Sequence, residues 1–110
     1  MAKWVVSLSI GGFLLAGAML AQDKNAAGDA GKGKEVFDQC SVCHNSDSEE
    51  RKVGPGLKGL FKHDKLANGK KVTEANVREL INMGGNGMPS YSDLLSDQEK
   101  NDVIAFLKTL

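Results

Sequence analysis

The segment QCSVCHN, from Gln39 to Asn45, is the most informative stretch of this chain. It holds both cysteines of the 110-residue sequence, Cys40 and Cys43, and one of the two histidines, His44. If these residue types were placed at random, Cys-x-x-Cys-His would be expected on the order of 0.0006 times in such a chain. The spacing therefore indicates a chemical role and not an accident of composition.

Four interpretations compete for the two cysteines. A structural disulfide across two intervening residues closes a very small loop, so it removes little entropy from the unfolded chain. A thioredoxin-like redox pair needs a βαβ context, and no strand-like alternation precedes Cys40. Structural zinc needs four ligands, and beyond the motif only His63 remains, in a charged segment where we expect an exposed side chain.

Covalent attachment of haem is the interpretation that the motif favours. Two thiols on adjacent helical turns can add to the two vinyl groups of one porphyrin edge, and the next residue, His44, then supplies an axial nitrogen. The sequence therefore predicts one covalently attached haem c, bound through Cys40 and Cys43, with His44 as an axial ligand of the iron. Without the cofactor, we expect the site as an apolar cleft between His44 and Met88.

Met88 is the candidate for the second axial ligand. It lies in GGNGMPSY, where glycines let the backbone run close to a flat ring and Pro89 fixes the chain direction after the ligand. Thioether ligation opposite histidine is an arrangement that raises the reduction potential of haem iron. Met83, at the end of a predicted helix, is expected to lie in the core.

The N-terminal residues resemble an export signal. The short basic start MAK is followed by the apolar run WVVSLSIGGFLLAGAML and then by small and polar residues. This pattern predicts a signal peptide over residues 1–21, cleaved after residue 18 or 21, a flexible linker over residues 22–31, and a periplasmic protein. The alternative is an uncleaved membrane anchor, because about 17 apolar residues can just span a bilayer. The charges balance, with 14 basic and 14 acidic residues, so no nucleic-acid partner is indicated.

Three helices are predicted in a single domain over residues 32–110. The first covers residues 32–40 and has Gly33, Val36, Phe37 and Cys40 on one face. The second begins after Thr73, turns Val77, Leu80 and Ile81 inward, and ends at Gly84-Gly85. The third begins with a capping box between Ser96 and Glu99 and carries the apolar stripe Val103, Phe106, Leu107 and Leu110. The fold class is therefore all-α, with long loops.

The long connection over residues 45–72 contains one apolar stretch, VGPGLKGLF. The carbonyl of Pro55 is placed to accept the second ring N–H of His44, which would fix the tautomer of the ligand. Leu57 and Phe61 are expected to pack around the edge of the ring, as part of the haem pocket.

These segments resemble the class I, mitochondrial-type cytochromes c of bacteria, near the c2 and small periplasmic groups. GKEVFDQCSVCHN, VGPGLKGLF, GGNGMPSY and SDQEKNDVIAFLKTL carry the resemblance, from Gly33 to Leu110. It implies the cytochrome c fold, with Cys40 and Cys43 in thioether bonds and His44 and Met88 as axial ligands. It also implies that Gly33 and Phe37 cross Val103 and Phe106 in a pair of terminal helices.

The predicted function is one-electron transfer, not catalysis. Two protein ligands leave the iron no position for a substrate, while one ring edge near the cysteines stays exposed for weak, transient docking of redox partner proteins. Two alternatives remain. One is a haem protein with an open iron that binds a gas or peroxide, and the other is a tethered cytochrome subunit of a larger oxidoreductase.

Overall fold

The computed structural model describes residues 27–110, and the predicted signal peptide lies outside this range. The order of elements is α1 (Ala30–Phe37), the short 3-10 helix η1 (Leu60–Lys62), α2 (Glu74–Met83) and α3 (Asp97–Leu107). Within residues 27–110 there is no β-strand, only two isolated bridges. The predicted all-α class is confirmed. No helix among these residues is both long and apolar enough to cross a membrane.

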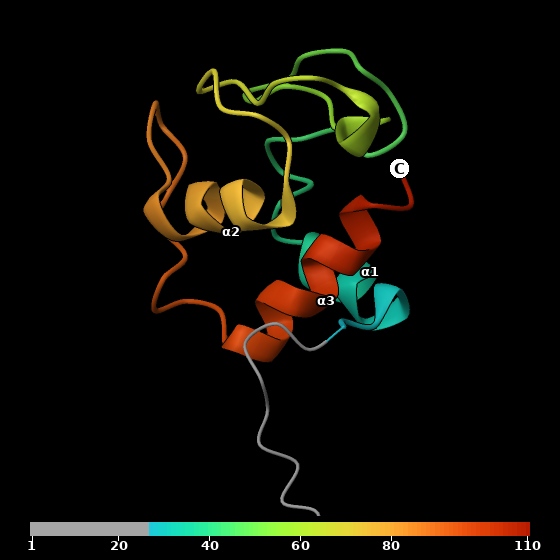
Figure 1. Ribbon diagram of the computed structural model, residues 1–110, viewed down its shortest axis with the longest axis vertical. Helices are drawn as coiled ribbons and strands as arrows, with labels where there is room; N and C mark the ends of the chain where they lie inside the picture. The colour runs from blue at the N-terminus through green and yellow to red at the C-terminus, as the bar shows by residue number, and fades with distance from the viewer. Residues whose placement is uncertain (1–26) are drawn as a thin grey trace, which may run out of the picture.

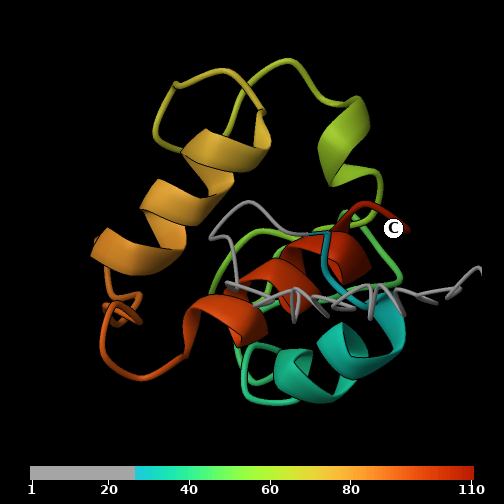
Figure 2. The same ribbon diagram turned by 60° about the horizontal axis from the view of Figure 1, so that its bottom comes forward.

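Helices α1 and α3 pack against each other at Gly33. A β-carbon on Gly33 would lie 2.8 Å from Cβ of Phe106, 2.5 Å from the carbonyl carbon of Asp102 and closer still to its oxygen. The rings of Phe37 and Phe106 meet beside this point, with centroids 5.3 Å apart and planes tilted by 50°. In both ribbon views the two helices lie side by side at one end of the domain (Figure 1, Figure 2). The predicted crossing is confirmed.

Helix α1 begins and ends earlier than the sequence pattern predicts. The side chain of Asp29 accepts a hydrogen bond from the Lys32 amide at 3.0 Å, so Asp29 is the N-cap and the helix starts inside the predicted linker. The α-helix ends at Phe37, and Cys40 lies in the hydrogen-bonded turn that follows it directly. Gly33 and Phe37 are buried as expected.

The ends of α2 and α3 agree with their predicted caps. Oγ1 of Thr73 accepts from the Asn76 amide at 3.1 Å, and Gly84 closes α2 with φ of 63°, a conformation that suits glycine. Ser96 and Glu99 form the reciprocal capping box, with side chain-to-backbone bonds of 3.1 and 3.0 Å. Local sequence signals are therefore sufficient to fix these boundaries.

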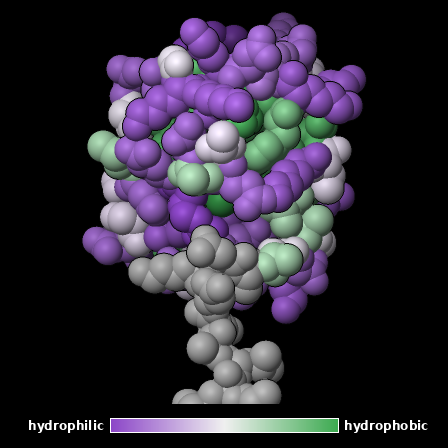
Figure 3. Space-filling view, in the orientation of Figure 1, coloured by the Kyte–Doolittle hydropathy of each residue, from purple (hydrophilic) through white to green (hydrophobic). Residues whose placement is uncertain are grey.

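The core is small and joins all three helices to the long middle segment. Its buried members are Phe37, Leu66, Val77, Val103, Ile104 and Leu107. Residues 45–72 arch over the end of the domain opposite α1 and α3 (Figure 1, Figure 2). One face of the molecule is mostly hydrophilic, with hydrophobic side chains visible in recesses between polar ones (Figure 3). The long connection therefore contributes Leu66 to the core instead of lying free on the surface.

One prediction about burial is wrong. Met83 is 69 % exposed and not in the core, because the inward face of α2 runs through Val77 and Met83 lies off that stripe. On α3, three polar residues that are not part of the predicted apolar stripe are also buried: Lys100, Asn101 and Asp102. Each has a partner from another segment: Ser92 O, the Arg78 guanidinium and the Asp29 amide respectively.

Candidate haem site

The Cys-x-x-Cys-His segment continues the winding of α1 by one further turn. The Cys40 amide donates to Phe37 O at 2.8 Å, and the His44 amide donates to Cys40 O at 3.0 Å. Cys43 follows Cys40 by three residues, so the two side chains lie one turn apart. Both cysteines are half-buried and neither is in a disulfide.

His44 is held in one orientation by the chain around Pro55. Its Nδ1 lies 2.7 Å from the Pro55 carbonyl oxygen, as predicted. A carbonyl only accepts hydrogen bonds, so Nδ1 must carry the proton, and Nε2 keeps its lone pair for a metal. A β-carbon on Gly54 would lie 2.5 Å from Cε1 of the imidazole, so glycine is needed for the ring to pack there.

Backbone bonds keep this arrangement in register. The Gly54 amide donates to Cys43 O and the Leu57 amide to Asn45 O, both at 2.8 Å. The segment around Pro55 therefore runs alongside the motif and carries Leu57 with it. Leu57 and Phe61 are both partly buried and pack against the core.

Tyr91 belongs to the same site, although the sequence analysis did not select it. Burial raises the pKa of its phenol, and the charges of Cys40 and Cys43 raise it further. Burial also raises the pKa of the Cys40 thiol, with a smaller contribution from Cys43. The contributions of both cysteines mean that the Tyr91 phenol lies within electrostatic range of the pair. Tyr91 follows Met88 by three residues.

Met88 closes a two-residue hairpin. Gly85 and Met88 exchange backbone hydrogen bonds of 2.9 and 3.0 Å. The residues between them, Asn86 and Gly87, have φ of 53° and 91°. Positive φ at both positions is the requirement of a type I′ turn, for which Asn-Gly is the preferred pair. The Asn-Gly signal was present in the sequence and could have predicted this turn.

The residues present fit a haem. Besides the metal-ready Nε2 of His44 and the two unbonded thiols, apolar side chains around the core are left only partly covered. They come from several segments and include Val36, Leu57, Leu60, Phe61, Val72, Leu80 and Ile81. A large flat apolar group would cover such surface, which a core this small cannot cover alone. No group of three or more His, Cys, Asp or Glu residues suited to a metal ion occurs in residues 27–110.

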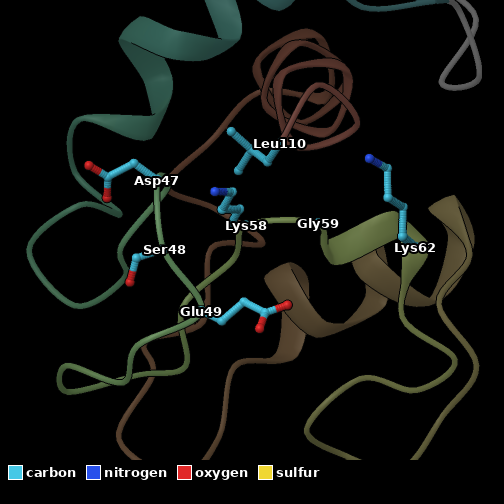
Figure 4. A pocket seen from close by; sticks show the side chains of 7 residues that line it. All are labelled: Asp47, Ser48, Glu49, Lys58, Gly59, Lys62 and Leu110. Atoms are coloured by element: carbon cyan, nitrogen blue, oxygen red, sulfur yellow. The ribbon is translucent and has the colours of Figure 1, made fainter.

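Two hollows lie in the described part of the chain away from His44 and Met88. A hollow of about 450 Å³ is lined by Asp47, Ser48, Glu49, Lys58, Gly59, Lys62 and Leu110 (Figure 4). A larger one of about 840 Å³ lies between α2 and α3 and includes Arg78 and Met83. Neither includes His44 or Met88. His63, by contrast, is exposed as expected, with its Nε2 3.2 Å from Oε1 of Glu49.

Comparison with known proteins places this geometry in a family. Residues 30–110 match the sequence family described as cytochrome c. Cytochrome c2 of Blastochloris viridis is 33 % identical over 100 residues, covering 76 % of this chain and 79 % of the relative. Cytochrome c6 of Leptolyngbya boryana is 35 % identical over 80 residues, covering 72 % of this chain and 89 % of the relative.

A solved structure agrees with the sequence relatives. The crystal structure of cytochrome c6 from the diatom Phaeodactylum tricornutum superposes with a TM-score of 0.58 at 29 % identity, covering 74 % of this chain and 93 % of that one. The fold, the motif and the relatives agree. The chain belongs to the cytochrome c family, as a class I electron carrier with one covalently attached haem c.

Proposed function

We propose that this protein is a periplasmic one-electron carrier whose haem is bound through Cys40 and Cys43 and ligated by His44 and Met88. The observation that carries the proposal is the 2.7 Å contact between His44 Nδ1 and Pro55 O, which leaves Nε2 as a metal ligand beside two unbonded thiols. The glycine-rich hairpin from Gly85 to Met88 supports Met88 as the second ligand, because it lets the backbone run close to a flat ring.

The role of the protein chain is to keep the ligands of the iron in fixed positions. The bound haem iron supplies a one-electron Fe(II)/Fe(III) couple. Pro55 and Gly54 fix the imidazole of His44, so its position need not change with the charge at the metal. The partly covered apolar side chains exclude water, and this low polarity disfavours the more highly charged oxidised state. A neutral thioether from Met88 acts in the same direction, so we expect a high reduction potential.

Two axial ligands from the protein also argue against an enzyme. With His44 and Met88 both bound, the iron has no free position at which a substrate could react. The test is the absorption spectrum of the holoprotein, reduced and oxidised, before and after addition of carbon monoxide. A thioether-to-iron charge-transfer band in the oxidised form and no fast reaction with carbon monoxide are expected. A fast spectral change with carbon monoxide would instead support the open-iron alternative.

Export is tested by the mass of the mature protein. A chain secreted by cells able to attach haem should have lost residues 1–18 or 1–21 and gained the mass of one haem. Retention of the full N-terminus in a membrane fraction would support the anchored alternative.

The surface beside the cysteines suits brief docking of a redox partner. Val42 and Val53 are 70 % and 72 % exposed, and they lie on adjacent segments. Nζ of Lys52 donates to Ser41 O at 2.9 Å, which joins these two segments directly. Two exposed apolar side chains next to a haem attachment point can form a small, weak interface, as electron-transfer encounters do.

This docking surface can be tested with a matched pair of variants. Val42→Glu should slow electron exchange with a membrane or periplasmic redox partner while leaving the absorption spectrum unchanged. Met83→Glu, at an equally exposed apolar residue on α2, should leave the exchange rate unchanged. Equal slowing of electron exchange in both variants would show that the partner does not dock specifically around Val42.

A further inference from the structure

The segment that carries Met88 is joined to the end of α2. The last turn of a helix leaves carbonyl groups without partners inside the helix. Here Leu80 O accepts from the Gly84 amide at 2.7 Å, Ile81 O accepts from the Tyr91 amide at 3.0 Å, and Asn82 O accepts from the hydroxyl of Ser90. We call residues 84–91 the Met88 loop. It therefore supplies the C-terminal hydrogen bonds of α2.

These bonds hold the loop on both sides of Met88. Gly84 and the hairpin lie before it, and Ser90 and Tyr91 lie after it. The loop is also packed tightly at its start: a β-carbon on Gly84 would lie 2.5 Å from Pro89 O and closer still to Met88 O. Met88 cannot move far from α2 without breaking at least one of these contacts.

The hydrogen bond from Ser90 differs from the other two in that its donor is a side chain. The bonds from Gly84 and Tyr91 come from backbone amides, which almost any residue provides, whereas the bond to Asn82 O comes from a side chain. Ser90 is exposed and is not part of the core. Its hydroxyl could be solvated by water, yet it bonds to the helix end, two residues after Met88. Its role therefore concerns the position of the loop and not the packing of the domain.

We propose that Ser90 is a positioning residue for Met88: its bond to Asn82 O keeps the sulfur on the iron by opposing local lifting of the loop. The inference rests on the proposed ligation by His44 and Met88. Without the hydroxyl, the loop after Met88 is attached to α2 through the Tyr91 amide. The fraction of molecules with Met88 detached then rises, while the packing of α1 against α3 is unaffected.

Imidazole is a suitable probe, because it binds ferric haem iron only where Met88 has left. Its apparent dissociation constant equals the intrinsic one divided by the detached fraction. A side-chain hydrogen bond of ordinary strength corresponds to about a fivefold change in that fraction. We therefore expect Ser90→Ala holoprotein to bind imidazole about fivefold more tightly than the wild type. Ser90→Thr, which keeps the hydroxyl, should restore wild-type affinity.

Ser92→Ala is the matched control: the Ser92 hydroxyl lies 3.2 Å from that of Ser90, and its removal keeps the hydroxyl that donates to Asn82 O. It should bind imidazole and unfold in urea like the wild type. Ser90→Ala should show tighter imidazole binding together with a lower urea midpoint, because the bond to Asn82 O is absent from both the detached and the unfolded states. Equal imidazole affinity in Ser90→Ala and Ser92→Ala would overturn the role of Ser90. A lower urea midpoint in Ser90→Ala without tighter imidazole binding would also overturn it, because Ser90 would then be merely structural.

Met88→Ala separates this inference from the ligation on which it rests. If Met88 is the ligand, Met88→Ala loses the thioether charge-transfer band and binds imidazole far more tightly than Ser90→Ala does. If the wild type and Met88→Ala bind imidazole with the same affinity, both the ligation by Met88 and the role of Ser90 are rejected. If Met88→Ala binds imidazole more tightly and Ser90→Ala does not, only the role of Ser90 is rejected.

Discussion

Replacing Gly33 with alanine tests the packing of α1 against α3. By helix propensity alone the change should stabilise the protein, since alanine is better than glycine inside a helix by about 1 kcal/mol. The structure predicts the opposite sign. The new methyl group would lie 2.5 Å from the carbonyl carbon of Asp102 and 2.8 Å from Cβ of Phe106. One of these neighbours is backbone, so it cannot rotate away.

The size of the effect follows from the separation that the methyl group requires. Ordinary contact with the Asp102 carbonyl oxygen would need the helices to move apart by roughly 1.5 Å. Overpacking of this kind costs about 1–3 kcal/mol. The movement also weakens the Phe37–Phe106 ring contact, worth about 1 kcal/mol. After the gain in propensity is subtracted, we expect Gly33→Ala to lose about 2 kcal/mol.

Urea unfolding of the holoprotein, followed by far-UV circular dichroism, measures this difference. Gly31→Ala in the same helix is the control, because its nearest neighbour would be a side-chain oxygen of Asp29 at 3.1 Å, which can shift. It should be as stable as the wild type or more stable. If Gly33→Ala is also as stable as the wild type, α1 and α3 do not meet at Gly33 and the reasoning fails.

Three further predictions concern the site and the helix ends. Gly54→Ala should displace the His44 imidazole, because the new methyl group would lie 2.5 Å from Cε1. Potentiometric titration should then give a changed reduction potential. An unchanged potential would refute the contact. Ser96→Ala should cost about 1 kcal/mol in urea unfolding by removing the capping box, whereas Ser92→Ala, outside the helix, should cost far less. Tyr91 is the single tyrosine, and burial raises its pKa above 10.0. Because the pKa is raised in the folded state, stability that is present below pH 10 is lost as the phenol ionises. Ultraviolet titration should therefore place ionisation of Tyr91 above that of free tyrosine, together with falling stability. Ionisation at or below pH 10 would contradict this.

Much of the fold could be predicted because its signals are local. Thr73, Gly84, Ser96 and Glu99 act on backbone groups within a few residues, and the attachment motif occupies five consecutive positions. The contact between His44 and Pro55 is longer in range, yet it was predictable from chemistry. A ligating imidazole needs an acceptor for its second nitrogen, and the Pro55 carbonyl is an available one.

The buried polar residues of α3 could not be predicted, because their partners lie in other segments. Burial of Asp102 depends on the Asp29 amide, 73 residues away, and burial of Lys100 depends on the carbonyl of Ser92. Amphipathic periodicity cannot detect such pairs, because it treats every charged residue as exposed. Met83 is exposed for a simpler reason: its angle around α2 takes the side chain off the face that carries Val77.

The pairing of α1 with α3 joins the first and the last helix of the described residues, and the bond from the Asp29 amide to Asp102 spans 73 residues. For a chain exported from its N-terminus, we expect Cys40 and Cys43 to emerge before α3 does. During that interval α1 has no partner, so we expect the two thiols to be accessible for attachment of the porphyrin. Closure of the domain would then follow formation of the thioether bonds.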